Sequence, residues 1–425
     1  GITGCNFGIV GQLIRGNIRC RDYTSSYPYV MTNPKYYYPV TRYKLYGDVK
    51  SKDDWDKFKS KLNTHCCLFE VQFIGLKLKE GWPMPFISKS RCKFTEHDKC
   101  ANGKIVSADV AVKITNEIEF KDIIKHYEFD NVFIKDLRTA RRGKLPKIIR
   151  EFIRDLFSDK TELKDVKGKE LDYLLSKGDL NGIYGMMATN PLKSEIPYDF
   201  EEMHGVNQEL TKNEEMEKYN KVIKSKKTFL NFAWGCYVTS HGRHILLEAI
   251  AIANMHDTFL YCDTDSVYYV TDQEIEKAFE EYNKEMTKGS LSAITPAGDK
   301  STLGEMTIDG DYTAFLAYGA KKYFCEKKDG SLKMTVAGVP KKNKATGEDI
   351  NDWANGIEYI HIGMTFTGAQ TGKLRPDYQV IPLAYRNVNG CKMLTGAYIN
   401  LMPTDYNLNE SIFDDLFFEK IQFGC

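Results

Sequence analysis

The sequence has no long apolar run. Within its 425 residues no stretch approaches the apolar length that a membrane-spanning helix needs, and the first residues lack the basic-then-apolar pattern of a signal segment. An excess of one charge is also absent, because 59 lysines and arginines balance 58 aspartates and glutamates. We therefore expect no membrane partner. Overall charge gives no argument for nucleic acid, so a surface for it must come from local segregation of charge.

Paired cysteine motifs are missing as well. The 11 cysteines are odd in number and scattered, which favours free thiols in a reducing compartment, the cytoplasm. A zinc site is one hypothesis for the histidines and cysteines between residues 65 and 100. That segment holds no Cys-x-x-Cys pair, and Cys66 and Cys67 fall in a strand-like run, so buried thiols are the favoured interpretation. The residues concerned are His65, Cys66, Cys67, Cys92, His97 and Cys100.

Two acids interrupt an apolar and aromatic run at residues 261–266, which read YCDTDS. The flanking residues predict a β-hairpin with the acids at its tip. Residues two apart in a strand share a face, so Asp263 and Asp265 would present both carboxylates together. Such a pair repels unless a cation lies beside it, and Mg²⁺ or Mn²⁺ would neutralise it. The alternative is an ordinary polar turn, where Asp is common.

A second acid-bearing segment, RDYTSSYP, occupies residues 21–28. An acid that ends a strand, followed by small polar residues and an aromatic before proline, predicts a strand that turns sharply into a helix. Such a turn leaves backbone amides and a carbonyl free for phosphate and metal contacts. The alternative is that Asp22 simply caps the helix.

A helix is expected from residue 168 to residue 185. Lys177, Asn181 and Tyr184 would form one stripe on it, suited to phosphates at one end and a base or sugar at the other. Alternatively the helix is amphipathic, with Tyr184 in the core and Lys177 in solvent. Glycines at 178, 182 and 185 cost about 1 kcal/mol each in a helix, which close approach of a ligand would explain.

Two basic segments suit a polyanion. One of them contains seven lysines and arginines and a single acid, Asp136. This segment is either a solvated helical face or a contact with nucleic acid. In the other, AKKYF at residues 320–324, a strand would place Lys321 and Tyr323 on one face, although an edge lysine is the usual alternative. The seven cations are Lys135, Arg138, Arg141, Arg142, Lys144, Lys147 and Arg150.

The remaining pattern predicts a mixed chain. Strands are expected near residues 67–76, and a protruding hairpin or loop is expected at residues 188–228. Helices are expected at residues 53–62, from Asn116 to 127, and at residues 145–157, 234–255 and 273–288.

The three centres occur in the order and with the residues of the polymerase motifs of family B DNA polymerases, which they closely resemble. Here the motifs are DYTSSYP, KxxxNxxYG and YCDTDS. Lys321-Lys322-Tyr323 is similar to the Lys-x-Tyr motif of the protein-primed branch of small phages, and the Thr3-Gly4-Cys5 start resembles its glycine-rich linker imperfectly. The resemblance extends to about residue 402.

This resemblance implies an α+β right-hand polymerase. The palm would be an antiparallel sheet, the fingers helical and the thumb small, with two insertions. The expected boundaries are palm at 1–33 and 233–340, a first insertion at 34–145, fingers at 146–187, a hairpin-like second insertion at 188–232, thumb at 341–402 and an unmatched tail at 403–425.

The resemblance also implies residue roles. Asp22 and Asp265 would hold two Mg²⁺ ions, for which Mn²⁺ could substitute, with the Tyr23 carbonyl as a further ligand and Asp263 as a supporting acid. Lys177 would hold the triphosphate. Other nucleotide contacts would come from Tyr23, Ser25, Ser26, Tyr27, Asn181 and Tyr184, and DNA contacts from Gly185, Thr264, Lys321, Tyr323, Arg141 and Arg142.

The implied activity is template-directed DNA synthesis from a primer 3′-hydroxyl, with primer-template DNA and dNTPs as partners. A terminal protein as primer and strand displacement are implied by the branch. Family members carry an N-terminal 3′-5′ exonuclease domain, whereas only 21 residues precede Asp22, so no proofreading is expected from this chain. Two alternatives stay open. A metal-dependent nuclease would not need the Lys177 stripe, and an inactive nucleic-acid-binding module would have no reason to keep Asp22, Asp265 and Lys177 together.

Overall fold

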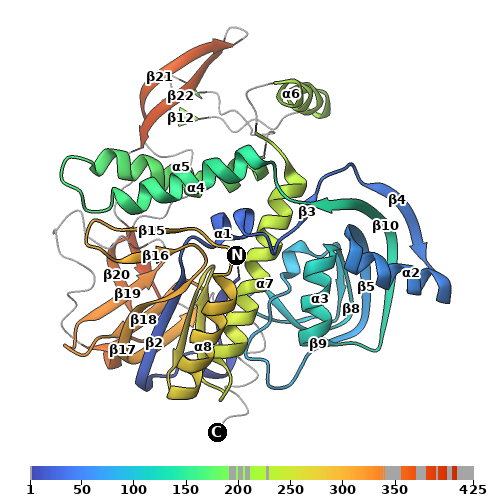
Figure 1. The fold of residues 1–425 in the computed structure, drawn as a ribbon. Helices are drawn as coiled ribbons and strands as arrows, with labels where there is room; N and C mark the ends of the chain where they lie inside the picture. The colour runs from blue at the N-terminus through green and yellow to red at the C-terminus, as the bar shows by residue number, and fades with distance from the viewer. Residues whose placement is uncertain are drawn as a thin grey trace.

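The computed structural model describes residues 2–190, 198–199, 204–205, 211–225, 229–337, 339, 356–369, 380–388, 391–399 and 404–408. Two large antiparallel sheets and a set of helices make up this part of the chain (Figure 1). The mixed content confirms the α+β prediction. In these ranges no helix is long and apolar enough to cross a membrane.

The seven-stranded sheet carries the predicted acidic hairpin. Its strands lie in the order β1-β13-β14-β2-β17-β18-β19. β13 and β14 are apolar on both faces, as their near-continuous burial shows, because helices cover one face and aromatic rings fill the other. The bounds are β1 Thr3–Cys5, β13 Phe259–Asp263, β14 Ser266–Val270, β2 Ile14–Tyr23, β17 Met306–Gly319, β18 Lys322–Glu326 and β19 Leu332–Val336.

Helix α7 (Phe232–Ala253) lies between the two large sheets (Figure 1). It is apolar on most of its surface, as expected for a helix that is buried by neighbours on several sides. It contacts β13 and β14 on one side and α3 (Glu117–His126) on the other. Helix α8 (Gln273–Met286), capped by Asp272, packs beside it, and α1 (Ser26–Thr32) follows β2. The helices expected near these positions are confirmed.

The eight-stranded sheet falls within the segment expected as the first insertion. Its main path is β3-β10-β5-β8-β6, and β4, β7 and β9 join its sides. Helix α2 (Lys52–Thr64) starts at a capping box of Ser51 and Asp54, and α3 starts at the Asn116 cap that the sequence indicated. The bounds are β3 Tyr38–Pro39, β4 Lys44–Val49, β5 His65–Leu78, β6 Phe94–Glu96, β7 Lys99–Ala101, β8 Lys104–Asn116, β9 Tyr127–Glu128 and β10 Asn131–Gly143.

Helices α4 (Lys147–Glu162) and α5 (Glu170–Ala188) pack against each other across one end of the seven-stranded sheet (Figure 1). Smaller strand pairs complete the described chain. They are β11 Tyr198–Asp199 with β12 His204–Gly205, β15 Ser292–Ile294 with β16 Lys300–Thr302, β20 Thr365–Ala369 with β23 Thr404–Asn407, and β21 Val380–Val388 with β22 Cys391–Ile399.

Two predictions of local structure were wrong in part. The segment 188–228 does contain the strand pair β11 and β12, but it also contains helix α6 (Lys212–Lys224). Its many charged residues suggested a loop, yet most of them are good helix formers and Thr211 with Glu214 forms a capping box.

The basic segment 135–150 is not one helical face. Residues up to Gly143 belong to β10, because Ile134, Leu137 and Ala140 fill the core of the eight-stranded sheet. A bulge around Asp136, whose φ is 50°, keeps these apolar residues facing inward. The helix begins only at Lys147.

The tail expected from residue 403 is partly integrated. β23 pairs with β20, and Leu408 is buried in the cluster next to β18 and β19. The rest of the tail, and residues 341–355, 370–379, 389–390 and 400–402 of the expected thumb, lie outside the described residues.

Gly304 provides a test of how α1 is seated against the sheet. Its φ is +84°, and a Cβ there would lie 2.1 Å from Cδ2 of the buried Tyr29 ring. We expect Gly304→Ala to lower the free energy of unfolding by at least about 3 kcal/mol, because it combines left-handed strain with overpacking. Gly298 has a φ of +90° and open space around it, so Gly298→Ala should cost only about 1–2 kcal/mol. Equal losses in urea unfolding would contradict the packing argument.

Candidate active site

Asp22 and Asp265 meet across neighbouring strands of the seven-stranded sheet. Asp22 lies near the end of β2, and Asp265 lies in the turn between β13 and β14. Asp22 pairs with Ser266 across β2 and β14, and the Tyr23 N–H donates to the Asp265 carbonyl at 2.9 Å. Strand pairing therefore brings together two acids that are far apart in the sequence.

A cavity of about 440 Å³ opens beside these acids. The three acids of the sequence analysis and both residues of the Lys-x-Tyr pair contribute to its wall. The lining residues are Asp22, Asp263, Thr264, Asp265, Ser266, Tyr268, Asp309, Lys321, Tyr323 and Lys333.

Burial and repulsion by neighbouring carboxylates raise the pKa values of the two acids. Loss of hydration, together with the charges of Asp265 and Asp309, raises the pKa of Asp22 to about 7. The pKa of Asp265 is also raised, mainly by burial, although Ser26 Oγ donates to its carboxylate at 3.3 Å. In the described part of the chain, no lysine or arginine forms an ion pair with either carboxylate.

This donor set suits a divalent cation. Two half-buried carboxylates without a paired cation, and the Tyr23 carbonyl next in the chain to Asp22, are the oxygen ligands that Mg²⁺ prefers. No group of three or more His, Cys, Asp or Glu side chains is placed to hold an ion within the described ranges. Mg²⁺ retains several waters in its shell, so two carboxylates and a carbonyl would be sufficient protein ligands.

Asp263 differs from the other two acids because it is already neutralised. Lys321 Nζ lies 2.9 Å from its Oδ1 and 2.7 Å from its Oδ2, and Thr3 Oγ1 donates to Oδ1 at 3.0 Å. Thr3 belongs to β1, which pairs with β13 directly opposite Asp263. The expected shared strand face for Asp263 and Asp265 was wrong in detail. Asp265 lies in the turn after Thr264, whose φ is +61°, yet both acids still reach one cavity.

The expected strand at residues 320–324 was also wrong in part. β17 ends at Gly319, and Lys321, with a φ of +56°, lies in the turn before β18 begins at Lys322. The Lys321 N–H donates to the Tyr261 hydroxyl at 2.8 Å, which fixes this turn beside the hairpin. Tyr323 is a core residue whose hydroxyl accepts from Tyr268 at 3.2 Å. The two residues therefore line the cavity from a turn and a strand.

The entry to α1 forms a second wall of the site. Ser25, the N-cap of α1, has a φ of 56° and makes no capping hydrogen bond, so its hydroxyl is free to accept from Lys160 Nζ at 3.1 Å. Asp22 is thus not the helix cap. The Tyr27 ring packs on the Tyr184 ring of α5 with centroids 4.7 Å apart. Gly242 of α7 allows this packing, because a Cβ there would lie 2.8 Å from Tyr27 Cε1.

Helices α4 and α5 supply cations next to the acids. Lys177 and Asn181 are exposed on α5, whereas Tyr184 is half-buried against Tyr27. A Cβ at Gly178, Gly182 or Gly185 would meet nothing within 4 Å, so packing between described residues does not require these glycines. Lys160 of α4 lies close enough to Lys177 and Asp22 for both charges to act on it, and burial lowers the pKa of its ammonium.

Sequence reasoning missed Asp309, Lys333 and Lys160. Lys333 Nζ lies 3.2 Å from Asp309 Oδ2 and 3.0 Å from the Tyr312 hydroxyl, and this group borders the cavity opposite Asp22. Asp309 and Lys333 belong to no motif, and only strand pairing reveals them. β17 brings Asp309 beside β2, and β19, which pairs with β18, brings Lys333 to Asp309. Lys160 lies beyond the helix expected at residues 145–157, and the observed α4 includes it because that helix continues to Glu162.

Arg141 and Arg142 do not line the cavity. Arg142 donates to the carbonyls of Leu62 and His65 at 3.5 and 3.0 Å, and its guanidinium lies over the Tyr37 ring. It therefore holds the eight-stranded sheet together. Arg141 is exposed at the end of β10.

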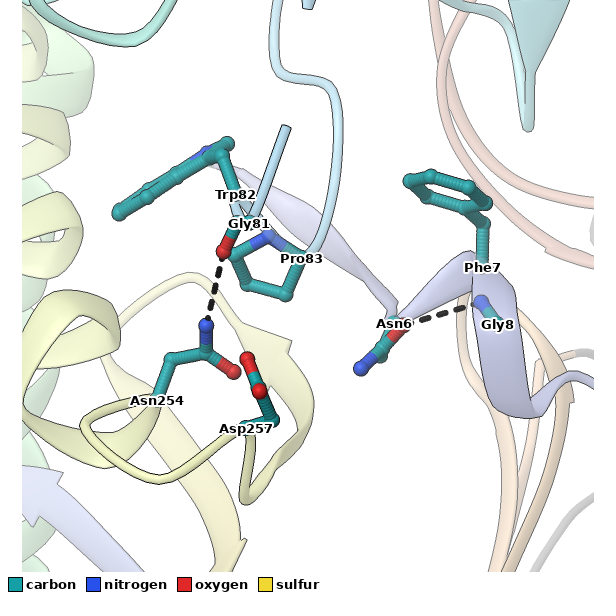
Figure 2. Close-up of a pocket in the computed structure, with 8 residues that line it drawn as sticks. All are labelled: Asn6, Phe7, Gly8, Gly81, Trp82, Pro83, Asn254 and Asp257. Atoms are coloured by element: carbon teal, nitrogen blue, oxygen red, sulfur yellow. Dashed lines mark hydrogen bonds between the residues drawn. The ribbon is translucent and has the colours of Figure 1, made fainter. Parts of the chain in front are cut away.

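Figure 2 shows a second cavity, of about 190 Å³, away from these acids. Asn254 Nδ2 donates to the Gly81 carbonyl at 3.1 Å across its wall. None of the residues predicted for chemistry lies there, so we give it no part in the site. Its lining residues are Asn6, Phe7, Gly8, Gly81, Trp82, Pro83, Asn254 and Asp257.

No family model and no curated protein sequence matches this chain. Solved structures do match it. Phi29 DNA polymerase in its ternary complex with primer-template DNA and incoming nucleotide superposes with a TM-score of 0.64 at 16% identity. The chain shares its fold with Phi29 DNA polymerase.

Phi29 DNA polymerase complexed with single-stranded DNA gives a TM-score of 0.61 at 17% identity. Both matches cover 96% of this chain and 60% of the Phi29 chain, so the chain spans 60% of the length of the structures it matches. The resemblance to protein-primed family B polymerases, drawn from three short motifs, is confirmed at the level of fold.

The raised pKa of Asp22 makes a prediction about stability. Because its pKa in the folded protein exceeds that in the unfolded chain, Asp22 contributes stability below pH 4 that is lost as the pH rises to about 7. We expect Asp22→Asn to raise the free energy of unfolding in metal-free buffer by about 1–3 kcal/mol at pH 8, with a gain that grows between pH 4 and 7.

Urea unfolding in EDTA at several pH values measures this gain. Asp299→Asn is the control, because Asp299 is exposed in the β15–β16 turn and should show no such growth with pH. A gain for Asp22→Asn that is constant across this range would contradict the assigned repulsion.

Proposed function

We propose that this chain is a DNA-directed DNA polymerase that extends a primer 3′-hydroxyl by two-metal-ion phosphoryl transfer. One observation supports this most strongly. The uncompensated acids Asp22 and Asp265 border the same region as the cations Lys160 and Lys177, which lie on a helix pair facing them. An acid pair suited to a metal ion, with two lysines beside it, fits phosphoryl transfer, whereas acids alone would fit a nuclease equally well.

In this proposal the seven-stranded sheet is the palm, α4 and α5 are the fingers, and the eight-stranded sheet is the first insertion. The second insertion is the segment that includes α6, and the thumb comprises the region of β20 to β22. The Phi29 likeness supports this division, and the Phi29 structures with primer-template DNA support such DNA as the partner.

Mg²⁺ held by Asp22, Asp265 and the Tyr23 carbonyl would lower the pKa of the primer hydroxyl and stabilise charge on the leaving pyrophosphate. The chain's own residues do the positioning. Lys177 and Lys160 bind the triphosphate, the latter from beside Ser25. The pKa of Asp22 is about 7, so its carboxyl group is protonated at acidic pH. Because a metal ligand must be deprotonated, a higher Mg²⁺ concentration would be needed to fill the site there.

The remaining predicted contacts fit the same picture. Asn181 and Tyr184 lie beside the new base pair, with Gly185 allowing DNA to approach α5. When DNA binds, the Lys321 ammonium leaves Asp263 and pairs with a primer phosphate. Thr264 and Tyr323 lie beside the path of the DNA. Priming from a terminal protein and strand displacement rest on the family resemblance alone.

Asp265→Asn should lower primer extension by about two orders of magnitude or more, because it removes one ion-binding charge. Binding of the primer-template duplex should be preserved, since no DNA contact is lost. Gel-based extension with each dNTP, and fluorescence anisotropy of the labelled duplex, measure the two properties. Asp299→Asn should retain both.

Retained extension by Asp265→Asn would refute the metal assignment. Cleavage of the primed template in Mg²⁺, without extension by the unmodified chain, would favour a nuclease instead. Duplex binding with neither activity would favour an inactive binding module.

Tyr27 should discriminate against ribonucleotides. Its ring is fixed by Tyr184 on one side and Gly242 on another, so a 2′-hydroxyl on the incoming sugar would collide with it. We expect Tyr27→Val to raise the ratio of rNTP to dNTP incorporation at least tenfold (about 1.4 kcal/mol) in single-nucleotide extension. Tyr46→Val, on an exposed strand residue, should leave the ratio unchanged. An unaltered ratio for Tyr27→Val would rule out this role.

A further inference from the structure

A continuous chain of polar side chains crosses the molecule behind the acidic cavity. At its outer end, Asp122 of α3 accepts from His244 of α7, with 2.7 Å between Asp122 Oδ1 and His244 Nδ1. The other imidazole nitrogen, Nε2, lies 3.5 Å from Glu248 Oε1, one turn further along α7. This half of the chain connects the eight-stranded unit to the central helix.

The second half runs from the central helix to β2. The Tyr282 hydroxyl of α8 donates to Glu248 Oε2 at 3.2 Å. It also lies 2.6 Å from the Tyr23 hydroxyl, which donates to the Ile245 carbonyl at 2.7 Å. Four elements, α3, α7, α8 and β2, are therefore joined by one set of hydrogen bonds.

The two ends of this chain are shielded from water, whereas the His244 and Glu248 side chains between them are 34% and 29% exposed. Tyr23 is 1% exposed and Asp122 is 4% exposed. Buried polar groups of this kind are costly to leave without partners, so each member depends on its neighbours. Two flanking carboxylates hold the pKa of His244 above its usual value, although burial acts in the opposite direction. The network is thus well satisfied, which by itself would explain only stability.

The inner end of the network gives it a second consequence. Tyr23 follows Asp22 directly, and its ring points to the opposite side of β2 from the Asp22 carboxylate. Its N–H holds the Asp265 carbonyl at 2.9 Å. Fixing the Tyr23 ring therefore fixes the Tyr23 N–H, which holds the Asp265 carbonyl. It also fixes the Tyr23 carbonyl, which would complete the ion site.

We propose that Tyr282, held in place by Glu248 and His244, is a positioning residue for the ion-binding edge of β2. Asp122 extends this control to the eight-stranded unit, so a displacement of that unit changes ion affinity. The proposal rests on the ion site of the proposed function. Outer groups that orient metal ligands change metal affinity by about 10- to 100-fold when removed, which makes the effect measurable.

The test measures Mn²⁺ binding to the DNA-free protein, by the EPR signal of free Mn²⁺, together with thermal unfolding. Tyr282→Phe and Tyr23→Phe should each weaken the site about tenfold. The loss should be larger for Tyr23→Phe, because the Tyr23 hydroxyl makes the shorter bond to the Ile245 carbonyl, 2.7 Å against 3.4 Å from Tyr282. Asp122→Ala should weaken the site less, and Asp122→Asn, which can still accept from His244, should restore it.

Tyr127→Phe is the matched control. Its hydroxyl is buried and bonds the Ile105 carbonyl at 2.9 Å and the Phe86 N–H at 3.1 Å, outside the network. It should lower the melting temperature like Tyr282→Phe and leave Mn²⁺ affinity unchanged. If Tyr23→Phe fails to fold, Tyr282→Phe decides, because Tyr23 keeps its bond to Ile245 in that variant.

The Asp265→Asn variant distinguishes failure of the proposed ion site from failure of the positioning role of Tyr282. If the unmodified chain binds no Mn²⁺, or if Asp265→Asn binds Mn²⁺ as tightly as the unmodified chain does, the ion site of the proposed function is refuted. If that Mn²⁺ site exists but Tyr282→Phe and Tyr23→Phe bind it as tightly as the unmodified chain, the network is structural only and the positioning role is overturned.

Discussion

Burial of the Asp22 and Asp265 carboxylates, to which the charge of Asp265 adds repulsion at Asp22, is the constraint on which the site depends. The sheet places two carboxylates in a partly dehydrated cavity where no lysine or arginine of the described residues pairs with either of them, and the pKa of each is raised. Asp263 shows the contrast, since Lys321 and Thr3 satisfy it within the same cavity. Among these three acids, only Asp263 is neutralised by an ion pair within the described residues.

The rest of the structure holds this arrangement in place. β14 and β17 flank β2, and α7 and α8 cover its far side, so the acids sit on a strand fixed by backbone pairing and by the buried Tyr23 ring. The side of the cavity near α1 and α5 is built differently. Tyr27 and Tyr184 come from two helices that meet through one ring contact, and Lys177 and Asn181 are exposed on α5. A rigid acid site thus faces a more open cationic helix, a division that suits a substrate that must enter and leave.

Much of this could be predicted from the sequence because the signals are local. Apolar and aromatic residues on both sides of the acids indicated the hairpin of β13 and β14, Asn116 marked the start of α3, and the spacing of Lys177, Asn181 and Tyr184 defined a helical stripe. Local signals failed where a residue's structure depends on distant partners. The basic segment before Gly143 became a strand because its apolar residues fill the eight-stranded core, and Lys321 became a turn residue because the Tyr261 hydroxyl receives its N–H.

The sequence by itself determined the residue types of the site and their order, since three motifs with an acid, a cationic stripe and an acid pair are defined by neighbours within a few residues. Only the tertiary structure decided which groups act on one another. The pairing of β2 with β14 and β17 joined Asp22 to Asp265 and added Asp309, the β1–β13 pair brought Thr3 to Asp263, and helix packing placed Lys160 beside Ser25. These contacts join residues that are remote in the chain, and their energies depend on burial and distance, which no local pattern records.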